Sequence, residues 1–261
     1  WKAQANIRYY DAQLDNASML SGTSEERVYN ASVAKRLAGA NVNETFTLKA
    51  GAKGGNYTNN SGASDTWLTT RAGVEYERLF NYETKVKADL SAYYADDPVS
   101  SGIYPGLSVM VKHPVMESLT LSFEGGAEPR MKTIEQLHTQ NRFLNVDNTL
   151  QHAYRINGQF ETSLAYSDLG TLNLGIAYEN ITDYPVYIRE TQSGNVGAPT
   201  LAFYEATYLD IYRAKAYASV TQQVISDRLR VNAKVYLQSP QVQDGGRIPF
   251  EEKVGVNAGV T

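Results

Sequence analysis

The chain of 261 residues contains no cysteine, and no apolar run in it approaches the roughly 20 residues that a membrane-spanning helix needs. The lack of cysteine is typical of a protein that does without disulfides in an oxidising compartment. A net charge of −4 offers no basic field, so we expect no nucleic-acid partner. These absences exclude a helical membrane protein but not a membrane protein that crosses the bilayer with strands.

The chain instead has a period of two. In the segment 66–94 uncharged residues occupy every second position of two runs, with mostly polar residues between them. The uncharged positions are Leu68, Thr70, Ala72, Val74 and Tyr76, then Val86, Ala88, Leu90, Ala92 and Tyr94. This alternation places one class of residue on each face of a β-strand. Each run is about ten residues long, which suffices for a tilted strand to cross a bilayer.

About twelve such runs follow one another along the chain, and the connections between them alternate in length. Short connections fall near 39–43, 79–82, 113–117, 167–170 and 224–228, and longer ones near 15–26, 54–65, 96–103, 127–148, 190–202 and 239–249. Short turns at one end and long loops at the other are typical of outer-membrane barrels. We therefore predict an all-β fold, a transmembrane antiparallel up-and-down β-barrel of about twelve strands that forms a single domain over residues 1–261.

Charges follow the same alternation. One face of nearly every strand carries them: Lys49, Lys53, Arg71, Glu75, Glu77, Lys85, Lys87, Asp89, Glu124, Arg155, Glu161, Arg213, Lys215, Arg230 and Lys234. A charge that faces lipid at mid-bilayer costs on the order of 2–4 kcal/mol. We therefore expect Leu68, Val74, Leu90, Phe160 and Val231 to face outer-membrane lipid, while the charges face a hydrated interior and pair across strands. Many of the 19 tyrosines lie near strand ends, where an amphipathic ring suits the headgroup level.

The second half of the chain, from residue 128 on, resembles the later barrel strands of TonB-dependent outer-membrane receptors. A strand ending in Glu128-Pro129-Arg130 leads into a loop with Thr133-Ile134-Glu135-Gln136-Leu137-His138 and Asn141-Arg142-Phe143-Leu144. The segments 178–187, 214–217, 247–250 and 254–257 are similar to further strand and loop motifs of that family. The resemblance implies a location in the bacterial outer membrane and ligand uptake through the loops and the lumen. It also implies a periplasmic energy-coupling or accessory protein as a partner.

The chain departs from that family in several respects, among them the absence of its Asn-Leu-Phe-Asp motif and of a terminal aromatic strand. Ala218-Ser219-Val220 stands where Gly-Val-Glu is common after the equivalent of Tyr217, and neither a plug domain nor a TonB box is recognisable. We therefore expect the chain to be an incomplete barrel with no plug domain present, or a divergent relative without energised import. The alternatives are a passive porin or a scaffold barrel that anchors other subunits of an outer-membrane complex.

The loop 129–148 is the place where we expect a ligand to bind. Its candidate contact residues are Arg130, Glu135, His138, Asn141 and Arg142. It also contains the sequence Thr133-Ile134-Glu135-Gln136, which has the form of a capping box and predicts one or two helical turns. No two of the three histidines have a metal-ligand spacing, so we predict no metal site, no cofactor and no catalytic residue.

Two other classes of protein remain open at this point. A barrel hydrolase of the phospholipase type would pair His152 with a serine such as Ser163, but alternation places these residues on opposite faces of one strand. His152 itself is expected on the lipid-facing side, close to a rim. A soluble β-sandwich adhesin would also show alternating strands, although it has no reason to sort its connections by length.

Overall fold

The computed structural model describes residues 1–14, 22–58, 64–81, 83–141, 143–144, 149–191, 202–225, 229–243, 245–248 and 251–260. It contains one antiparallel sheet and one short helix. The strands are β1 (Lys2–Leu14), β2 (Gly22–Ala38), β3 (Glu44–Thr58), β4 (Ser64–Phe80), β5 (Thr84–Asp96), β6 (Ser101–Met116), β7 (Leu119–Met131), β8 (His152–Ser167), β9 (Gly170–Thr191), β10 (Ala202–Ile225), β11 (Leu229–Val242) and β12 (Val254–Val260). The helix α1 spans Ile134–Gln140 and lies between β7 and β8.

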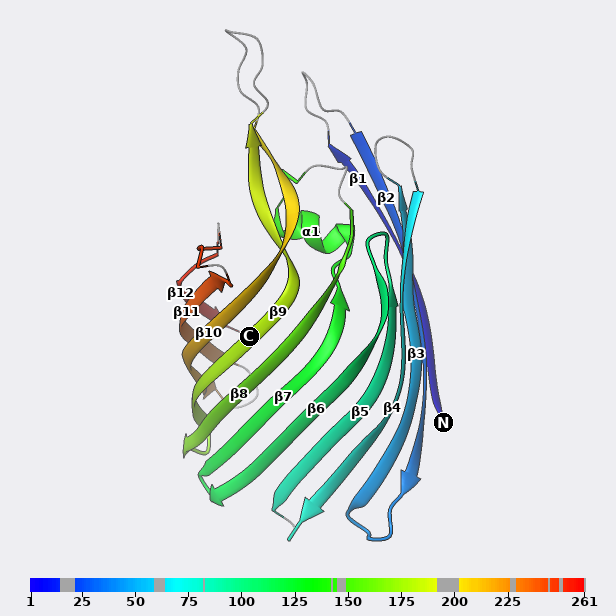
Figure 1. Ribbon diagram of the computed structural model, residues 1–261. Coiled ribbons are helices and arrows are strands. Elements are labelled where there is room, and N and C mark those ends of the chain that lie inside the picture. The colour runs from blue at the N-terminus through cyan, green and yellow to red at the C-terminus, as the bar shows by residue number, and fades with distance from the viewer. Residues whose placement is uncertain are drawn as a thin grey trace.

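The twelve strands pair strictly in chain order, from β1 to β12. Figure 1 shows that the sheet is tilted and strongly curved, with a concave inner side. Within the described residues β1 and β12 each pair on one side only, so the wall is open. The predicted number of strands and their up-and-down order are confirmed.

Most connections sort by length as the sequence predicts. The described turns 39–43, 117–118 and 168–169 lie at one end of the sheet. The C-terminal ends of β1, β3, β7, β9 and β11, which border the longer connections, lie at the other. The connection 97–100 was expected to be long, but it has only four residues. Asp97 explains its tightness, because its carboxylate accepts hydrogen bonds from the backbone N–H groups of Val99 and Ser100, each at 2.9 Å.

The two faces of the wall differ as the alternation predicts. Leu48, Val74, Leu90 and Leu107 are paired neighbours on β3 to β6 and form one outward row. Leu90 is 59% exposed and Phe160 42%, and neither packs into a protein core. Small or polar residues on the next positions point inward. The outer surface therefore has the apolar character of a surface that contacts hydrocarbon.

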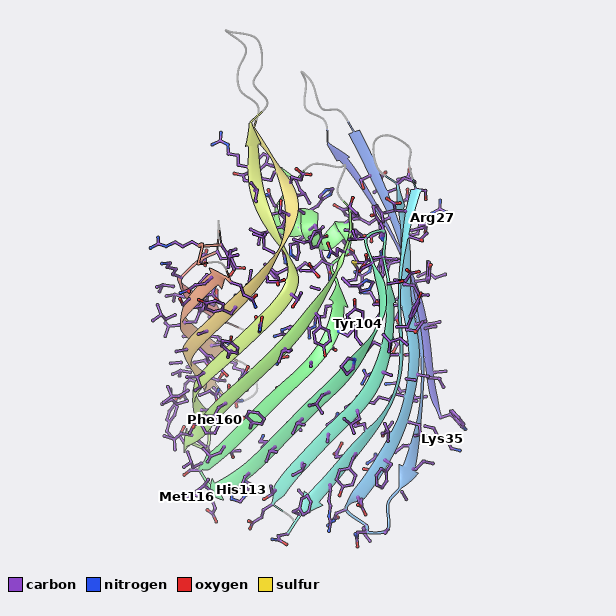
Figure 2. The ribbon with its side chains drawn as sticks, viewed as in Figure 1. Arg27, Lys35, Tyr104, His113, Met116 and Phe160 are labelled. Carbon is purple, nitrogen blue, oxygen red and sulfur yellow. The ribbon has the colours of Figure 1, made fainter. Side chains whose placement is uncertain are left out.

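Two cations on the outward face, Arg27 and Lys35, lie near its two ends. Arg27 lies over the ring of Tyr9, with 5.8 Å between the guanidinium carbon and the ring centroid, and Lys35 lies 5.0 Å from the ring centroid of Trp1. Figure 2 shows Arg27 close to the long-loop end and Lys35 close to the short-turn end. Each pair combines an amphipathic ring with a long basic side chain that reaches toward water. The apolar belt lies between these two levels.

The inward charges pair across strands. Asp89 on β5 lies 2.5 Å from Arg71 Nη2 and 3.1 Å from Lys49 Nζ, and Glu75 lies 3.0 Å from Lys87 Nζ and also pairs with Lys49. This network joins β3, β4 and β5 on the concave face, as expected for a hydrated lumen. In the described part of the chain no helix is long and apolar enough to cross a membrane.

Consecutive residues of β6 test the assignment of the two faces. Leu107 points outward, whereas Ser108 pairs with Asp89 and points inward. We predict that Leu107→Arg lowers the free energy of unfolding in phospholipid vesicles by about 2–4 kcal/mol, because it places a charge in hydrocarbon. Ser108→Arg should change it by less than about 0.5 kcal/mol, because the new guanidinium faces water and Asp89. Urea titration in vesicles measures both values, and an equal loss in the two variants would contradict the assignment.

Candidate functional site

The helix α1 lies on the concave side of the sheet, near the long-loop end (Figure 1). It begins with the predicted capping box. The Gln136 N–H donates to Thr133 Oγ1 at 3.3 Å, and the Thr133 N–H donates to Gln136 Oε1 at 3.1 Å. Both bonds satisfy backbone or side-chain groups that a helix start would leave unpaired, which explains how seven residues form a helix here.

An apolar cluster attaches α1 to the wall. Its buried members are Tyr57, Trp67, Met131, Ile134, Leu137, Leu144 and Leu150. Leu137 and Leu150 are fully buried, and the Leu150 N–H donates to the Tyr57 hydroxyl at 3.0 Å. Trp67 is so close to Gly55 on β3 that a Cβ at Gly55 would lie 2.6 Å from its Nε1, so only glycine fits there. The connection between β7 and β8 thus carries a small core of its own and is fixed to β3 and β4.

Polar contacts extend this attachment to β1, β2 and β9. The buried Glu26 accepts hydrogen bonds from Trp67 Nε1 at 3.3 Å and from the Glu135 N–H at 3.4 Å, and so holds the first turn of α1. Arg8 Nη1 lies 3.0 Å from Glu135 Oε2. At the other end of the helix the Tyr187 hydroxyl lies 2.8 Å from Gln140 Oε1. The helix therefore forms a roof that is bonded to both sides of the concave wall.

A hydroxyl, an imidazole and a carboxylate fix the point where this connection rejoins the wall. Thr69 Oγ1 lies 2.7 Å from His152 Nε2, and His152 Nδ1 lies 2.8 Å from Asp97 Oδ2. The His152 N–H also donates to Asp97 Oδ2, at 2.8 Å. Burial alone would raise the pKa of Asp97, but the hydrogen bonds from His152, Ser100 and Val99 hold it below its ordinary value.

The expected outward position of His152 is therefore wrong. The residue is only 6% exposed and packs edge-on against Trp67. It is the first residue of β8 and is bonded to Asp97 in the turn after β5, so the alternation of the strand does not extend to it. Its hydroxyl partner is Thr69 on β4, not Ser163.

Between α1 and the concave wall lies an open cavity of about 930 Å³. Five arginines line it: Arg8, Arg71, Arg130, Arg155 and Arg213. Each has a carboxylate partner. Their partners are Glu135 for Arg8, Asp89 for Arg71, Glu128 for Arg130, Glu179 for Arg155, and Glu179 with Glu251 for Arg213. The arginines therefore carry little uncompensated charge.

Two lysines on the same cavity differ from the arginines. Among the described residues neither Lys53 nor Lys132 has a carboxylate within 4.0 Å. Lys53 Nζ lies 5.4 Å from the ring centroid of Trp67. Lys132 Nζ donates to Gln140 Oε1 at 3.1 Å and lies 4.2 Å from the ring centroid of Tyr184. Burial lowers the pKa of Lys132 to about 8, so it still carries most of its charge at pH 7.

A second, smaller cavity of about 380 Å³ lies beside the C-terminal end of α1. Four of its ten lining residues are aromatic, namely Phe143, Tyr184, Tyr187 and Tyr204, and we call it the aromatic cavity. Gln140, Tyr184 and Pro185 line both cavities and separate them. The Tyr184 hydroxyl donates to Glu251 at 3.1 Å, which orients the ring between the two spaces.

The structure distributes the five candidate residues over different places. Arg130 and Glu135 line the basic cavity, and Asn141 lines the aromatic one. His138 lies near β1, with its Nδ1 3.4 Å from the Tyr10 hydroxyl. Arg142 lies outside the described residues. The loop-based prediction did not include Lys53, Lys132 and Tyr184, although the inward charge pattern had placed Lys53 in the lumen. No group of three or more potential metal-ligating side chains occurs among the described residues.

Comparisons with known proteins agree with this architecture. No family model matches the sequence, and no curated protein is similar to it. The copper transporter OprC has a TM-score of 0.69 and 13% identity, over 99% of this chain and 46% of that one. The siderophore receptor PirA from Acinetobacter baumannii has a TM-score of 0.62 and 11% identity, over 98% of this chain and 44% of that one. A mutant of the ferric enterobactin receptor PfeA from Pseudomonas aeruginosa has a TM-score of 0.61 and 12% identity, over 90% of this chain and 41% of that one.

The fold is therefore that of a transmembrane, outer-membrane β-barrel. The barrels that share it are TonB-dependent receptors, as the sequence motifs suggest. The chain spans less than half the length of these solved structures, so it corresponds to part of their wall.

The bonds to Asp97 generate a prediction about pH. In Asp97→Asn one side-chain oxygen can still hold the turn, but the amide nitrogen cannot accept the two bonds from His152. We predict a loss of about 2–3 kcal/mol in the free energy of unfolding at pH 7. Because the folded pKa of Asp97 is depressed, its contribution is complete above its unfolded value near 4 and disappears as the pH falls through the folded value.

Urea titrations of the wild type and the variant at pH 7 and at about pH 3 measure this effect. The difference between the two proteins should shrink at the lower pH. Asp96→Asn, at an exposed neighbouring position, is the matched control and should change little. A difference that stays constant across this range would show that the ionised carboxylate does not fix the connection.

Proposed function

We propose that this chain forms part of a ligand-binding barrel in the outer membrane of a bacterium, with its long-loop end at the cell surface. We treat residues 1–261 as one barrel domain, and the ligand occupies the cavity beneath α1. Ligand transport through the lumen, with energy from a periplasmic TonB-type partner, is part of the same proposal. The receptor architecture of the neighbours supports it.

The observation that carries the proposal is the pair of lysines without carboxylate partners. A barrel lumen contains many charges, but here five arginines pair with carboxylates, whereas no carboxylate of the described residues lies within 4.0 Å of the ammonium of Lys53 or Lys132. A partly buried ammonium without a counter-ion is costly. Anionic groups of a ligand in this cavity that contact the lysines would lower that cost. The favoured ligand therefore carries negative charge.

We infer that a ligand contacts the aromatic cavity before it enters the basic cavity. The aromatic cavity lies beside the C-terminal end of α1 and shares Tyr184 with the basic cavity. Rings offer a large apolar contact area with little loss of side-chain entropy. A ligand would pass from the aromatic cavity across Gln140 and Tyr184 to the lysines.

The roof favours binding over free diffusion. A passive porin needs an open lumen, whereas α1 here is held across the concave side by an apolar core and by bonds to β1, β2 and β9. A scaffold role has no specific observation in its favour. The fixed roof and the basic cavity together support a receptor.

The chain of Thr69, His152 and Asp97 has the order of a hydrolase triad. Two of its members are closed to substrate, since the side chains of His152 and Asp97 are 3% and 1% exposed. Asp97 also accepts hydrogen bonds from the backbone N–H groups of Val99 and His152, as expected for a residue with a structural role. We interpret the three residues as a structural hydrogen-bond network that holds the end of the β7–β8 connection in place, not as a catalytic site.

Citrate, a small polyanion, is a suitable probe for the lysine pair. We predict that the purified protein in detergent micelles binds citrate in isothermal titration calorimetry, and that Lys53→Gln or Lys132→Gln lowers its affinity about tenfold or more. Lys87→Gln is the matched control, because Lys87 also points inward but pairs with Glu75 outside the cavity. Its affinity should stay within about twofold of the wild type.

The affinity should also fall as the pH rises from 7 to 9. Lys132, whose pKa is lowered to about 8, loses its proton over this interval and then no longer attracts an anion. Lys132→Gln should remove most of this pH dependence. No citrate binding at millimolar concentration, or binding that the Lys53→Gln, Lys132→Gln double variant retains, would contradict the proposal.

A further inference from the structure

A groove of about 780 Å³ crosses the outward face of β8, β9, β10 and β11. It exists because paired outward positions differ in size. One row across these strands is Gly158, Tyr178, Ala214 and Ser239, and the row beside it is Phe160, Ile176, Ala216 and Leu237. A Cβ built on Gly158 would have no neighbour within 4 Å. The floor is therefore formed by Gly158 and the two alanines, and large side chains border it.

The groove lies inside the apolar belt. On β8 it is bracketed by two outward tyrosines, Tyr154 toward the long-loop end and Tyr166 toward the short-turn end. Tyr154 stacks on Tyr104 with ring centroids 5.7 Å apart, which marks one headgroup level. Figure 2 shows Tyr104 on the long-loop side of Phe160. Hydrocarbon chains, not water, are what surrounds a surface at this depth.

One end of the groove is basic. Lys253 lines it beside Ser239, and both residues are exposed. The two acidic residues next to Lys253 in the chain are engaged elsewhere, since Glu251 pairs with Arg213 and Glu252 accepts a hydrogen bond from the Tyr236 hydroxyl. Within the described residues Lys253 has no ion-pair partner. The groove thus combines an apolar body with an ammonium at one end.

We propose that this groove is a specific binding site for an anionic phospholipid. One acyl chain lies on Gly158, Ala214 and Ala216, and the phosphate contacts the Lys253 ammonium. This arrangement matches the chemistry of the lipid, which is apolar along its length and negatively charged at its head. The site is on the opposite face of the wall from the two cavities, so it does not depend on the proposed ligand.

Native mass spectrometry of the protein released from mixed micelles tests this site. The probes are dioleoyl phosphatidylglycerol, which is anionic, and dioleoyl phosphatidylcholine, which is zwitterionic. We expect one retained lipid per chain, with phosphatidylglycerol favoured at least fivefold. Gly158→Leu should reduce retention of both lipids at least fivefold, because it fills the floor. Lys253→Gln should abolish the preference for phosphatidylglycerol and leave retention of phosphatidylcholine unchanged.

Two controls lie outside the groove. Ala92→Leu adds the same bulk at an exposed outward position on β5, and Lys35→Gln removes another outward cation. Both should retain lipid as the wild type does, and heat-modifiable migration on a gel confirms that all variants fold. Unchanged retention in Gly158→Leu would overturn the proposal. A change in oligomeric mass in that variant, without a change in lipid, would show that a second copy occupies the groove and would also overturn it.

Discussion

The contrast between hydrocarbon on one side of the wall and water on the other determines most of this structure. Because side chains of a strand alternate between its faces, this contrast sorts every second residue. Leu90 is exposed to the outside, while its neighbour Asp89 lies in an ion-pair network on the inside. The same constraint explains why two cations on the outward face occur near the levels of Trp1 and Tyr9, where they reach water.

The outward face of the sheet is apolar but exposed, so the buried apolar side chains pack on the concave side. One buried apolar cluster lies under the β7–β8 connection, where Ile134 and Leu137 of α1 meet Trp67 and Tyr57 of the wall, and a second includes Ile181 and Ile211 of β9 and β10. The first cluster holds the roof in place by burial, and Glu26 and Asp97 add directional bonds. The cavities owe their shape to this roof. Ligand contact and structural anchoring thus depend on one connection.

The sequence alone predicted the strands of the wall and their two faces, but only part of the candidate site. Alternation placed Arg71 and Arg155 inside and Phe160 outside, because each strand position has only two choices of face. The capping box at Thr133 located α1 correctly. Lys132 lies within the loop where a ligand was expected, but its contact with Tyr184 and the bond between Thr69 and His152 were not predictable, since each joins segments far apart in the chain. His152 also lies where the strand ends and the period of two no longer applies.

The assignment of faces is tested most directly by a nitroxide scan along β5 in lipid vesicles, with one label at a time at positions 86–94. Electron paramagnetic resonance then measures the accessibility of each label to oxygen, which concentrates in hydrocarbon, and to a water-soluble nickel chelate. We expect a period of two, with oxygen maxima at even positions such as 90 and nickel maxima at odd positions such as 91. Accessibility without that period, or with the two faces exchanged, would contradict a membrane-spanning wall with a hydrated concave side.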